Sequence, residues 1–232
     1  MKTKKNLETL EATTTTKRKK PLPEVLSLPR LYEEIENAPL RDYEKAITYF
    51  LYLTGARASE ANKVLIDDFD KKPNPTYSST ETIVHLPTLK NPSLIKREVT
   101  IPTYRPIEKA MWRQVQLIGQ RAINKGLDRL IPYNRFKIYR MTTKIKFPLL
   151  VKRYEPHQTV EIAEFKVNPH YLRHCRLTHL VDEYGLDAYE LMQFAGWSNT
   201  NPASIYVNKS PLAVANKMRA KQALDLKAGA NA

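Results

Sequence analysis

Residues 168–185, with the sequence NPHYLRHCRLTHLVDEYG, carry the signals of both ends of an α-helix. Asn168 is a favoured N-cap residue, and Pro169 is favoured at the first helical position, where an N–H would be unpaired anyway. Leucine and valine recur along the stretch at helical spacing until Gly185, where we expect the helix to end. The sequence therefore predicts a helix that begins and ends at defined residues.

The beginning of this helix contains two residues suited to binding an anion. His170 and Arg173 lie three residues apart, so both side chains point to one face near the helix N-terminus. That end attracts phosphate through unpaired N–H groups and the helix dipole, and arginine adds a fork that can hold two phosphate oxygens. Alone, however, the pair is more typical of a capped, solvated helix start than of a site.

Apolar residues recur at helical spacing through much of the remaining chain. Helices are expected over residues 41–53, 58–65, 107–126, 188–195, 202–207 and 211–226. Gly55 is expected to end the first of these, and Val64 and Leu65 are expected to point inward in the second. Two β-rich stretches, 80–86 and 97–101, predict a hairpin with an exposed basic loop. The fold class expected is mainly α with a small antiparallel β-sheet (α+β).

The composition bounds the class of protein. The chain has 232 residues, of which 42% are hydrophobic, enough for one large domain with a buried core. The single cysteine, Cys175, argues against a disulfide framework and indicates a reducing compartment. There is no apolar run long enough to span a bilayer or to act as a signal peptide. We therefore expect a cytoplasmic protein, associated with the nucleoid if its host is prokaryotic and located in the host cell if it is viral.

The net charge of +14, with a pI near 9.7, is the strongest compositional signal. A field of this sign concentrates polyanions, and nucleic acid is the commonest polyanion in a cell. A basic solvated surface and an anionic membrane are the alternatives, and without a long basic amphipathic helix the membrane is the weaker one. Residues 1–23 are expected to form a disordered basic arm, residues 24–209 the folded domain, and residues 210–232 a C-terminal helix or tail.

Residues 129–154 contain no acidic residue and interleave basic with aromatic side chains. Such a surface suits a phosphate backbone, although a solvated face whose aromatic residues enter the core fits any single residue about equally well. The basic residues expected to contact DNA, here and at the end of the hairpin, are Lys96, Arg97, Arg135, Lys137, Arg140, Lys144 and Lys146.

Two further motifs accompany the helix at residue 168. Residues 53–60 read LTGARASE, which places Arg57 just after a helix-ending glycine and Glu60 one turn further on, able to orient it. Near the other end of the chain, Gly196-Trp197 precedes Tyr206, and the step from the tryptophan to the tyrosine is nine residues.

Together with the HYLRH of residues 170–174, these motifs resemble in order and spacing those of the tyrosine recombinase family, which includes phage integrases, Xer-type recombinases and Cre. The resemblance covers about residues 41–207. It implies that residues 24–209 form the catalytic domain of that family. It also implies a site-specific DNA recombinase that integrates or excises a mobile genetic element.

The resemblance implies a role for each matched residue. Tyr206 would be the nucleophile that attacks a DNA phosphodiester, giving a 3′-phosphotyrosyl link and a free 5′-hydroxyl. Arg57 and Arg173 would hold the non-bridging oxygens as charge builds in the transition state. His170 would assist proton movement at the tyrosine, and Trp197 would donate its indole N–H to the phosphate. Because the phosphotyrosyl bond conserves energy, neither ATP nor a metal ion nor another cofactor is required.

The family's hairpin lysine, which protonates the leaving 5′-oxygen, is best matched by Lys90. The loop after Lys90 is longer than in many relatives and lacks their glycine, so Lys96 remains a rival. His174 is expected to support the site. His170, His174 and Cys175 also resemble zinc ligands, but neither a second cysteine pair nor a His-Glu-x-x-His motif accompanies them, and no metal site is expected.

Several alternatives remain open. Too few residues precede Arg57 for the N-terminal helical domain of most family members, so we expect either an isolated catalytic domain or a naturally short enzyme. The rival functions are a type IB topoisomerase-like enzyme that relaxes DNA and a non-catalytic DNA-binding regulator. The expected partner is a double-stranded DNA attachment site, bound by a chain that is monomeric in solution and tetrameric on synapsed DNA. The apolar stripe of residues 211–226 is expected to dock on a neighbouring subunit, with packing on its own domain as the alternative.

Overall fold

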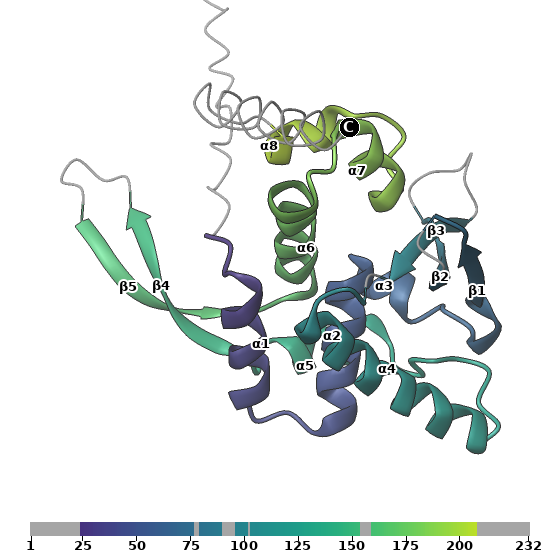
Figure 1. Ribbon diagram of the computed structural model, residues 1–232. Helices are drawn as coiled ribbons and strands as arrows, with labels where there is room; N and C mark the ends of the chain where they lie inside the picture. Colours follow the sequence, from purple (N-terminus) through teal and green to yellow (C-terminus); the bar gives the residue numbers. More distant parts are fainter. Residues whose placement is uncertain (1–23, 77–78, 90–95, 102, 154–158, 208–232) are drawn as a thin grey trace, which may run out of the picture.

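The computed structural model describes residues 24–76, 79–89, 96–101, 103–153 and 159–207, with the backbone alone at 149–153 and 159–163. The α-helices are α1 (Leu28–Asn37), α2 (Asp42–Thr54), α3 (Ala58–Ala61), α4 (Pro106–Asn124), α5 (Arg135–Thr142), α6 (Pro169–Tyr184), α7 (Ala188–Ala195) and α8 (Ser204–Val207). The strands are β1 (Phe69–Asn74), β2 (Ser79–Pro87), β3 (Lys96–Ile101), β4 (Lys146–Arg153) and β5 (Thr159–Lys166), and two short 3₁₀ helices are η1 (Ile66–Asp68) and η2 (Asn201–Ala203). The predicted class, mainly α with small antiparallel sheets, is confirmed (Figure 1). None of the helices in this part of the chain has the length and apolar character needed to cross a membrane.

The centre of the fold is α2, whose residues 46–54 are all buried. A helix that is apolar on every side must be surrounded, and α1, α4, α5 and α6 pack around this one. It begins with a capping box in which the Glu44 carboxylate accepts the Arg41 N–H at 2.9 Å. It ends as predicted at Gly55, whose φ of 58° lies in the left-handed region that favours glycine. Arg57, two residues after this glycine, therefore follows directly on the buried end of α2.

The helix α6 packs on α2 and carries the HYLRH motif. It begins and ends as predicted: the Asn168 side chain accepts the Tyr171 N–H at 2.9 Å, and Gly185 forms a left-handed C-cap. The second half of α6 forms a small core with α7 and η2 that consists of Leu177, Leu180, Val181, Leu191, Ala195 and Ala203. Because Trp197 and Tyr206 pack against this small core, it determines where both aromatic rings lie.

A three-stranded antiparallel sheet lies beside the helices, in the order β1-β2-β3 (Figure 1). The pairing of β2 with β3 confirms the predicted hairpin, and Leu86 pairs with Arg97 near its end. Side chains of β3 alternate between solvent and the interior, so that three of them are buried: Arg97, Val99 and Ile101.

A second hairpin, formed by β4 and β5, projects away from the helices (Figure 1). Its register runs from Lys146 opposite Lys166 to Arg153 opposite Thr159. At its base, the rings of Phe147, Phe165 and Tyr171 pack together with centroids 4.7 to 6.0 Å apart. This contact attaches the hairpin to α6.

Four features, α1, α5, β1 and the β4–β5 hairpin, are not predicted by the sequence pattern. Pro73 in β1 and Pro148 in β4 interrupt the expected strand pattern, and both are tolerated because these strands have an open edge. The helix predicted over residues 58–65 is wrong in length, since α3 ends at Ala61 and Leu65 is 40% exposed. The arm predicted at 1–23 and the helix predicted at 211–226 lie outside the described residues.

Candidate active site

Arg57 stands at the N-cap of α3, directly after the turn that ends α2. Its backbone N–H donates to Glu60 Oε2 at 2.9 Å, and its Nη1 donates to Glu60 Oε1 at 2.5 Å. Glu60 is fully buried, whereas 25% of the Arg57 side chain is exposed. The predicted contact between the two residues is present, and it orients a guanidinium group that solvent still reaches.

Arg173 extends from the second turn of α6 and is 3% exposed. Its Nη1 donates to the carbonyl of Gly55 at 2.6 Å and its Nη2 to the carbonyl of Ala195 at 2.8 Å. Both carbonyls lie at helix C-termini, where intrahelical donors are missing and the helix dipole favours a cation. Burial lowers the pKa of Arg173 to about 9, with contributions from the charges of Arg97 and Arg57. The guanidinium therefore remains charged at neutral pH.

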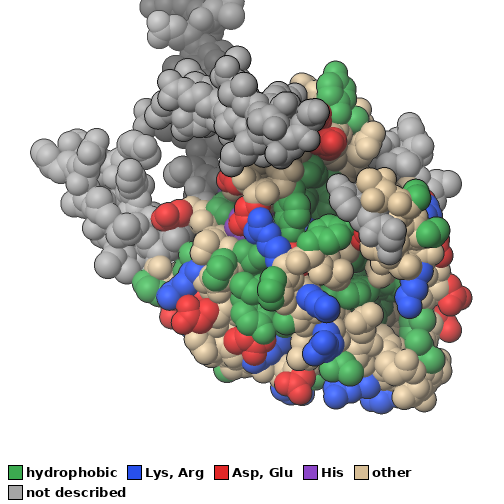
Figure 2. All heavy atoms as spheres, viewed as in Figure 1, with side chains coloured by type: hydrophobic (Ala, Val, Ile, Leu, Met, Phe, Trp, Pro, Cys, Tyr) green, Lys and Arg blue, Asp and Glu red, His purple; other side chains and the backbone are tan. Residues whose placement is uncertain are grey.

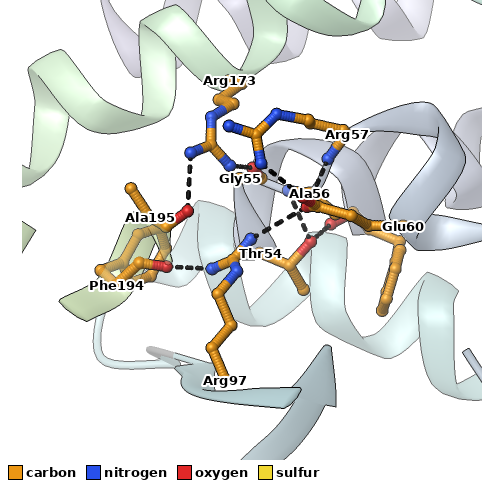
Figure 3. Close-up of polar contacts among 10 residues, drawn as sticks. Thr54, Gly55, Ala56, Arg57, Glu60, Arg97, Arg173, Phe194 and Ala195 are labelled. Atoms are coloured by element: carbon orange, nitrogen blue, oxygen red, sulfur yellow. Dashed lines mark hydrogen bonds and ion pairs between the residues drawn. The ribbon is translucent and has the colours of Figure 1, made fainter. Parts of the chain in front are cut away.

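Together with Arg57 and Arg173, Arg97 forms a cluster of three arginines near Glu60 (Figure 3). Because β3 turns it inward, it is only 2% exposed. Its Nη2 donates to Glu60 Oε2 at 3.4 Å, and its Nη1 donates to the carbonyl of Phe194. The predicted surface contact with DNA is wrong for Arg97, since its guanidinium is enclosed and, unlike that of the equally buried Arg173, is not among the groups that line the solvent-open hollow described below.

The cluster carries an excess of positive charge, because its three guanidinium groups face one carboxylate among the described residues, that of Glu60, which pairs with Arg57 and Arg97 and also acts on the charge of Arg173. Charges enclosed by protein interact more strongly than charges in water. An anion such as a phosphate is the complement that this arrangement favours.

Tyr206 on α8 lies beside the cluster. Its ring stacks on Trp197 with centroids 6.1 Å apart, and the His174 ring lies 5.4 Å away. The guanidinium carbon of Arg173 is 5.6 Å from the centroid of the Trp197 ring. Burial raises the pKa of the Tyr206 phenol, while the charge of Arg173 acts in the opposite direction. The hydroxyl thus keeps its proton at neutral pH until a base removes it.

An open hollow of about 220 Å³ connects the cluster with solvent. The residues that line it include Arg57, Arg173, His170 and, from α5, Tyr139. His170 is exposed, as expected for a side chain in the first turn of α6. The hollow therefore brings three of the predicted catalytic residues to one place.

The basic and aromatic segment 129–154 contributes to the surface beside the hollow. Its helix α5 exposes Arg135, Phe136, Tyr139 and Arg140. Lys137 is half-buried, with its Nζ 3.9 Å from the centroid of the Tyr133 ring. Of these residues, Tyr139 lines the hollow, so α5 borders the hollow at this tyrosine.

Three other lysines predicted to bind DNA are held in ion pairs. These pairs are Lys96 with Asp68 at 2.5 Å, Lys144 with Glu44 at 2.9 Å and Lys146 with Glu164 at 3.1 Å. On the face shown in Figure 2, lysine and arginine side chains are interspersed with acidic ones. Lys90, the preferred hairpin lysine, lies outside the described residues.

The sequence does indicate that the side chain of Arg97 points inward, although its positive charge favours the opposite prediction, a contact at the surface. Arg97, Val99 and Ile101 alternate with polar residues, and in a strand such residues share one face. Two apolar neighbours on that face indicate that the arginine also points inward.

The model of the phage integrase family matches residues 25–212. Because this match covers most of the chain, the protein belongs to the phage integrase family, and the resemblance to tyrosine recombinases is confirmed. A search of curated proteins gives no match.

Solved structures show the same fold at low sequence identity. XerA recombinase is 21% identical with a TM-score of 0.56, over 87% of this chain and 66% of its own. XerH recombinase, bound to its difH substrate before cleavage, is 17% identical with a TM-score of 0.53, over 84% of this chain and 53% of its own. The Tn1549 transposon integrase in complex with transposon right end DNA is 18% identical with a TM-score of 0.52, over 88% of this chain and 67% of its own. The chain thus spans between about half and two thirds of the length of these relatives.

Proposed function

We propose that the protein is a site-specific DNA recombinase that cleaves and rejoins DNA through a 3′-phosphotyrosyl intermediate. The observation that carries this proposal is the position of Tyr206 beside the guanidinium cluster around Glu60. The cluster suits a phosphodiester, and a phenol beside it is a nucleophile that a purely DNA-binding protein does not need. The XerH and Tn1549 structures hold DNA, which supports DNA as the substrate of this chain.

In the cleavage step, Tyr206 Oη attacks the phosphorus of one phosphodiester and the bond to the 5′-oxygen breaks. Arg57 and Arg173 hold the non-bridging oxygens, whose negative charge grows in the transition state. His170 takes the phenolic proton, and the Trp197 indole N–H donates to the phosphate. Because the phosphotyrosine conserves the bond energy, the 5′-hydroxyl of another strand reverses the step without ATP.

Lys90 is the proposed donor of a proton to the leaving 5′-oxygen. Thr88, two residues earlier, borders the site: a Cβ atom built on Gly196 would lie 3.0 Å from Thr88 Cγ2. The rival Lys96 is on the solvent side of β3, opposite to the buried Arg97, and is paired with Asp68. These placements favour Lys90.

The proposal includes the partners of the reaction. The substrate is a double-stranded attachment site of a mobile genetic element, bound in the cytoplasm, where the DNA of a prokaryotic host lies. Residues 24–209 form the catalytic domain. Strand exchange requires two duplexes, so four copies of the chain assemble on synapsed DNA while the free chain is a monomer.

Tyr206→Phe tests the nucleophile. The DNA is a duplex that the wild-type chain enriches from a random-sequence library, nicked so that cleavage releases a short fragment and traps the adduct. We expect the variant to bind this duplex as the wild type does but to form no adduct on a denaturing gel, because only the hydroxyl takes part in bonding. The control is Tyr189→Phe, which changes a tyrosine on α7 that is 69% exposed. An adduct formed by Tyr206→Phe would contradict the assignment of Tyr206 as the nucleophile.

A further inference from the structure

The proposed cleavage step uses Arg57 and Arg173 but gives no task to the third arginine of the cluster. Arg97 is buried, and both of its terminal nitrogens donate to protein oxygens (Figure 3). A phosphate in the hollow would be bound by the other two, because the residues lining the hollow include them and not Arg97. Burying a third cation costs free energy unless its hydrogen bonds and ion pairs compensate for the lost hydration, so the contacts of Arg97 indicate its role.

One contact of Arg97 is with the carboxylate that orients Arg57. Glu60 Oε1 accepts Arg57 Nη1 at 2.5 Å, while Oε2 accepts both the Arg57 N–H and Arg97 Nη2, at 2.9 and 3.4 Å. The two arginines thus approach the carboxylate from different sides. Its rotation would break at least one of these hydrogen bonds, so Arg97 helps to fix the direction of the Arg57 guanidinium.

The other contact of Arg97 is with the C-terminus of α7. Arg97 Nη1 donates to the carbonyl of Phe194, and Arg173 Nη2 donates to the next carbonyl, that of Ala195, at 2.8 Å. These are among the last carbonyls of the helix, which have no intrahelical donor. The end of α7 is therefore held between two arginines, and Trp197 follows two residues later.

The stem of Arg97 also packs against the residue that precedes this tryptophan. Gly196 has a φ of 66°, and a Cβ atom built on it would lie 2.5 Å from Arg97 Cδ. The same Cβ would lie 3.0 Å from Thr88 Cγ2, so Thr88, which directly follows β2, also lies close to this glycine. Only a residue without a side chain allows so close an approach.

We infer that Arg97 is a positioning residue, which holds the β2–β3 hairpin, the Glu60–Arg57 pair and the Gly196–Trp197 segment in one arrangement. This role rests on the proposed function, because it assigns to Arg97 the alignment of groups that act on the phosphate. Arg97 itself does not touch the DNA. Its planar fork is required, since a lysine has the same charge but cannot reach Glu60 and the Phe194 carbonyl with two separate, fixed nitrogens.

The test compares Arg97→Lys with Arg176→Lys in the full chain. Arg176 is also a fully buried arginine, but it is paired with Glu108 of α4 at 2.7 Å and serves as a control for the loss of stability. Cleavage of the nicked duplex enriched by the wild-type chain is measured at saturating protein, and binding is measured separately. The chain has two tryptophans, so Trp112→Phe leaves Trp197 as the only indole emitter in a second, activity-independent measurement.

We expect Arg97→Lys to reduce the cleavage rate about 10²-fold, as small misplacements of reacting groups do, with DNA affinity nearly unchanged. Trp197 emission should shift to the red and become easier to quench with acrylamide, and Arg176→Lys should change neither property to this extent. A cleavage rate of Arg97→Lys close to that of Arg176→Lys overturns the inference.

The two proposals can fail separately. If the wild-type chain forms no adduct with the enriched duplex, the proposed function fails, and Trp197 emission alone decides the inference. An emission of Arg97→Lys equal to that of the parent chain then overturns the positioning role, whereas a red shift upholds it. If Arg97→Lys does not fold, Arg97→Gln is measured in the same way, since its amide can occupy part of the same space.

Discussion

Arg57 and Arg173 reach the same hollow, but they are held by different kinds of partner. Arg57 is a quarter exposed and is oriented by a side-chain carboxylate. Arg173 is buried and donates to the backbone carbonyls at the ends of two helices, α2 and α7. The first arginine can be removed without disturbing the backbone, whereas the second also joins two helix ends. Their substitutions should therefore have the same effect on chemistry and different effects on stability.

We expect Arg57→Ala and Arg173→Ala each to reduce the cleavage rate by about 10²–10³-fold, the usual effect of losing one preorganised donor. Arg173→Ala should also reduce the free energy of unfolding by about 1–3 kcal/mol, because it leaves buried carbonyls without a donor. Arg57→Ala should reduce it less, because Glu60 keeps Arg97 as a partner. The measurements are single-turnover cleavage and urea unfolding. Cleavage by either variant within a few-fold of the wild-type rate would contradict the phosphate-binding role.

At the scale of residues, sequence spacing predicts contacts between residues that are close in the sequence. His170 and Arg173 share a helical turn, and Arg57 and Glu60 share a capping box, so a few residues of sequence contain the contact. Arg97 could not be predicted in the same way. Its partner Phe194 is 97 residues away in the sequence, and only the packing of β3 against α7 brings the two together.

At the scale of elements, the two helices that carry the first and second motifs, α2 and α6, have ends at residues with strong local preferences, and these ends are predicted well. The caps Gly55, Asn168 and Gly185 are examples. Strands on open edges have weaker signals, because their pairing depends on a neighbour and tolerates a proline such as Pro73. The capping box of α2 is one such local preference, and its contribution to the free energy of unfolding can be measured.

Glu44 in this capping box should make stability depend on pH. Burial alone would raise the pKa of Glu44, but the Arg41 N–H and the Lys144 ammonium outweigh it and lower the pKa to about 2. The unfolded chain then binds a proton more readily than the folded one, so stability falls as the pH falls from the ordinary glutamate range towards 2. We expect Glu44→Gln to be clearly less stable than the wild type at neutral pH, and this difference to shrink near pH 3 (about one unit above the folded pKa).

Urea midpoints of both proteins at the two pH values measure this effect. Glu33→Gln, which removes a carboxylate from the exposed face of α1, controls for the loss of one charge. A difference between Glu44→Gln and the wild type that is the same at both pH values would show that Glu44 stabilises α2 through its shape rather than its charge.

At the scale of the whole molecule, the net charge is concentrated towards the ends of the sequence. Residues 1–23 contain seven basic and two acidic residues, and residues 208–232 contain five and one. These segments thus account for +5 and +4 of the total of +14, which leaves +5 for the much longer segment 24–207. Composition alone does not predict how the charges of that segment are arranged, because pairs such as Lys144 with Glu44 join residues 100 positions apart.

This distribution makes the N-terminal segment a candidate for sequence-independent binding to DNA, while the hollow with Arg57 and Arg173 acts on one phosphodiester. Each phosphate neutralised by a lysine or arginine steepens the fall of affinity with salt, with a slope of about 0.9 per contact on logarithmic axes. Replacing the seven basic residues of residues 1–23 by glutamine should therefore reduce the slope by up to about six. At saturating DNA, the rate of covalent capture should stay the same, because these residues are not part of the candidate site.

Replacing Thr13, Thr14, Thr15 and Thr16 by serine is the matched control, since it changes the same segment without changing its charge. A salt slope that stays at the wild-type value in the glutamine variant would place the phosphate contacts elsewhere in the chain, with the exposed arginines of α5 as the next residues to replace.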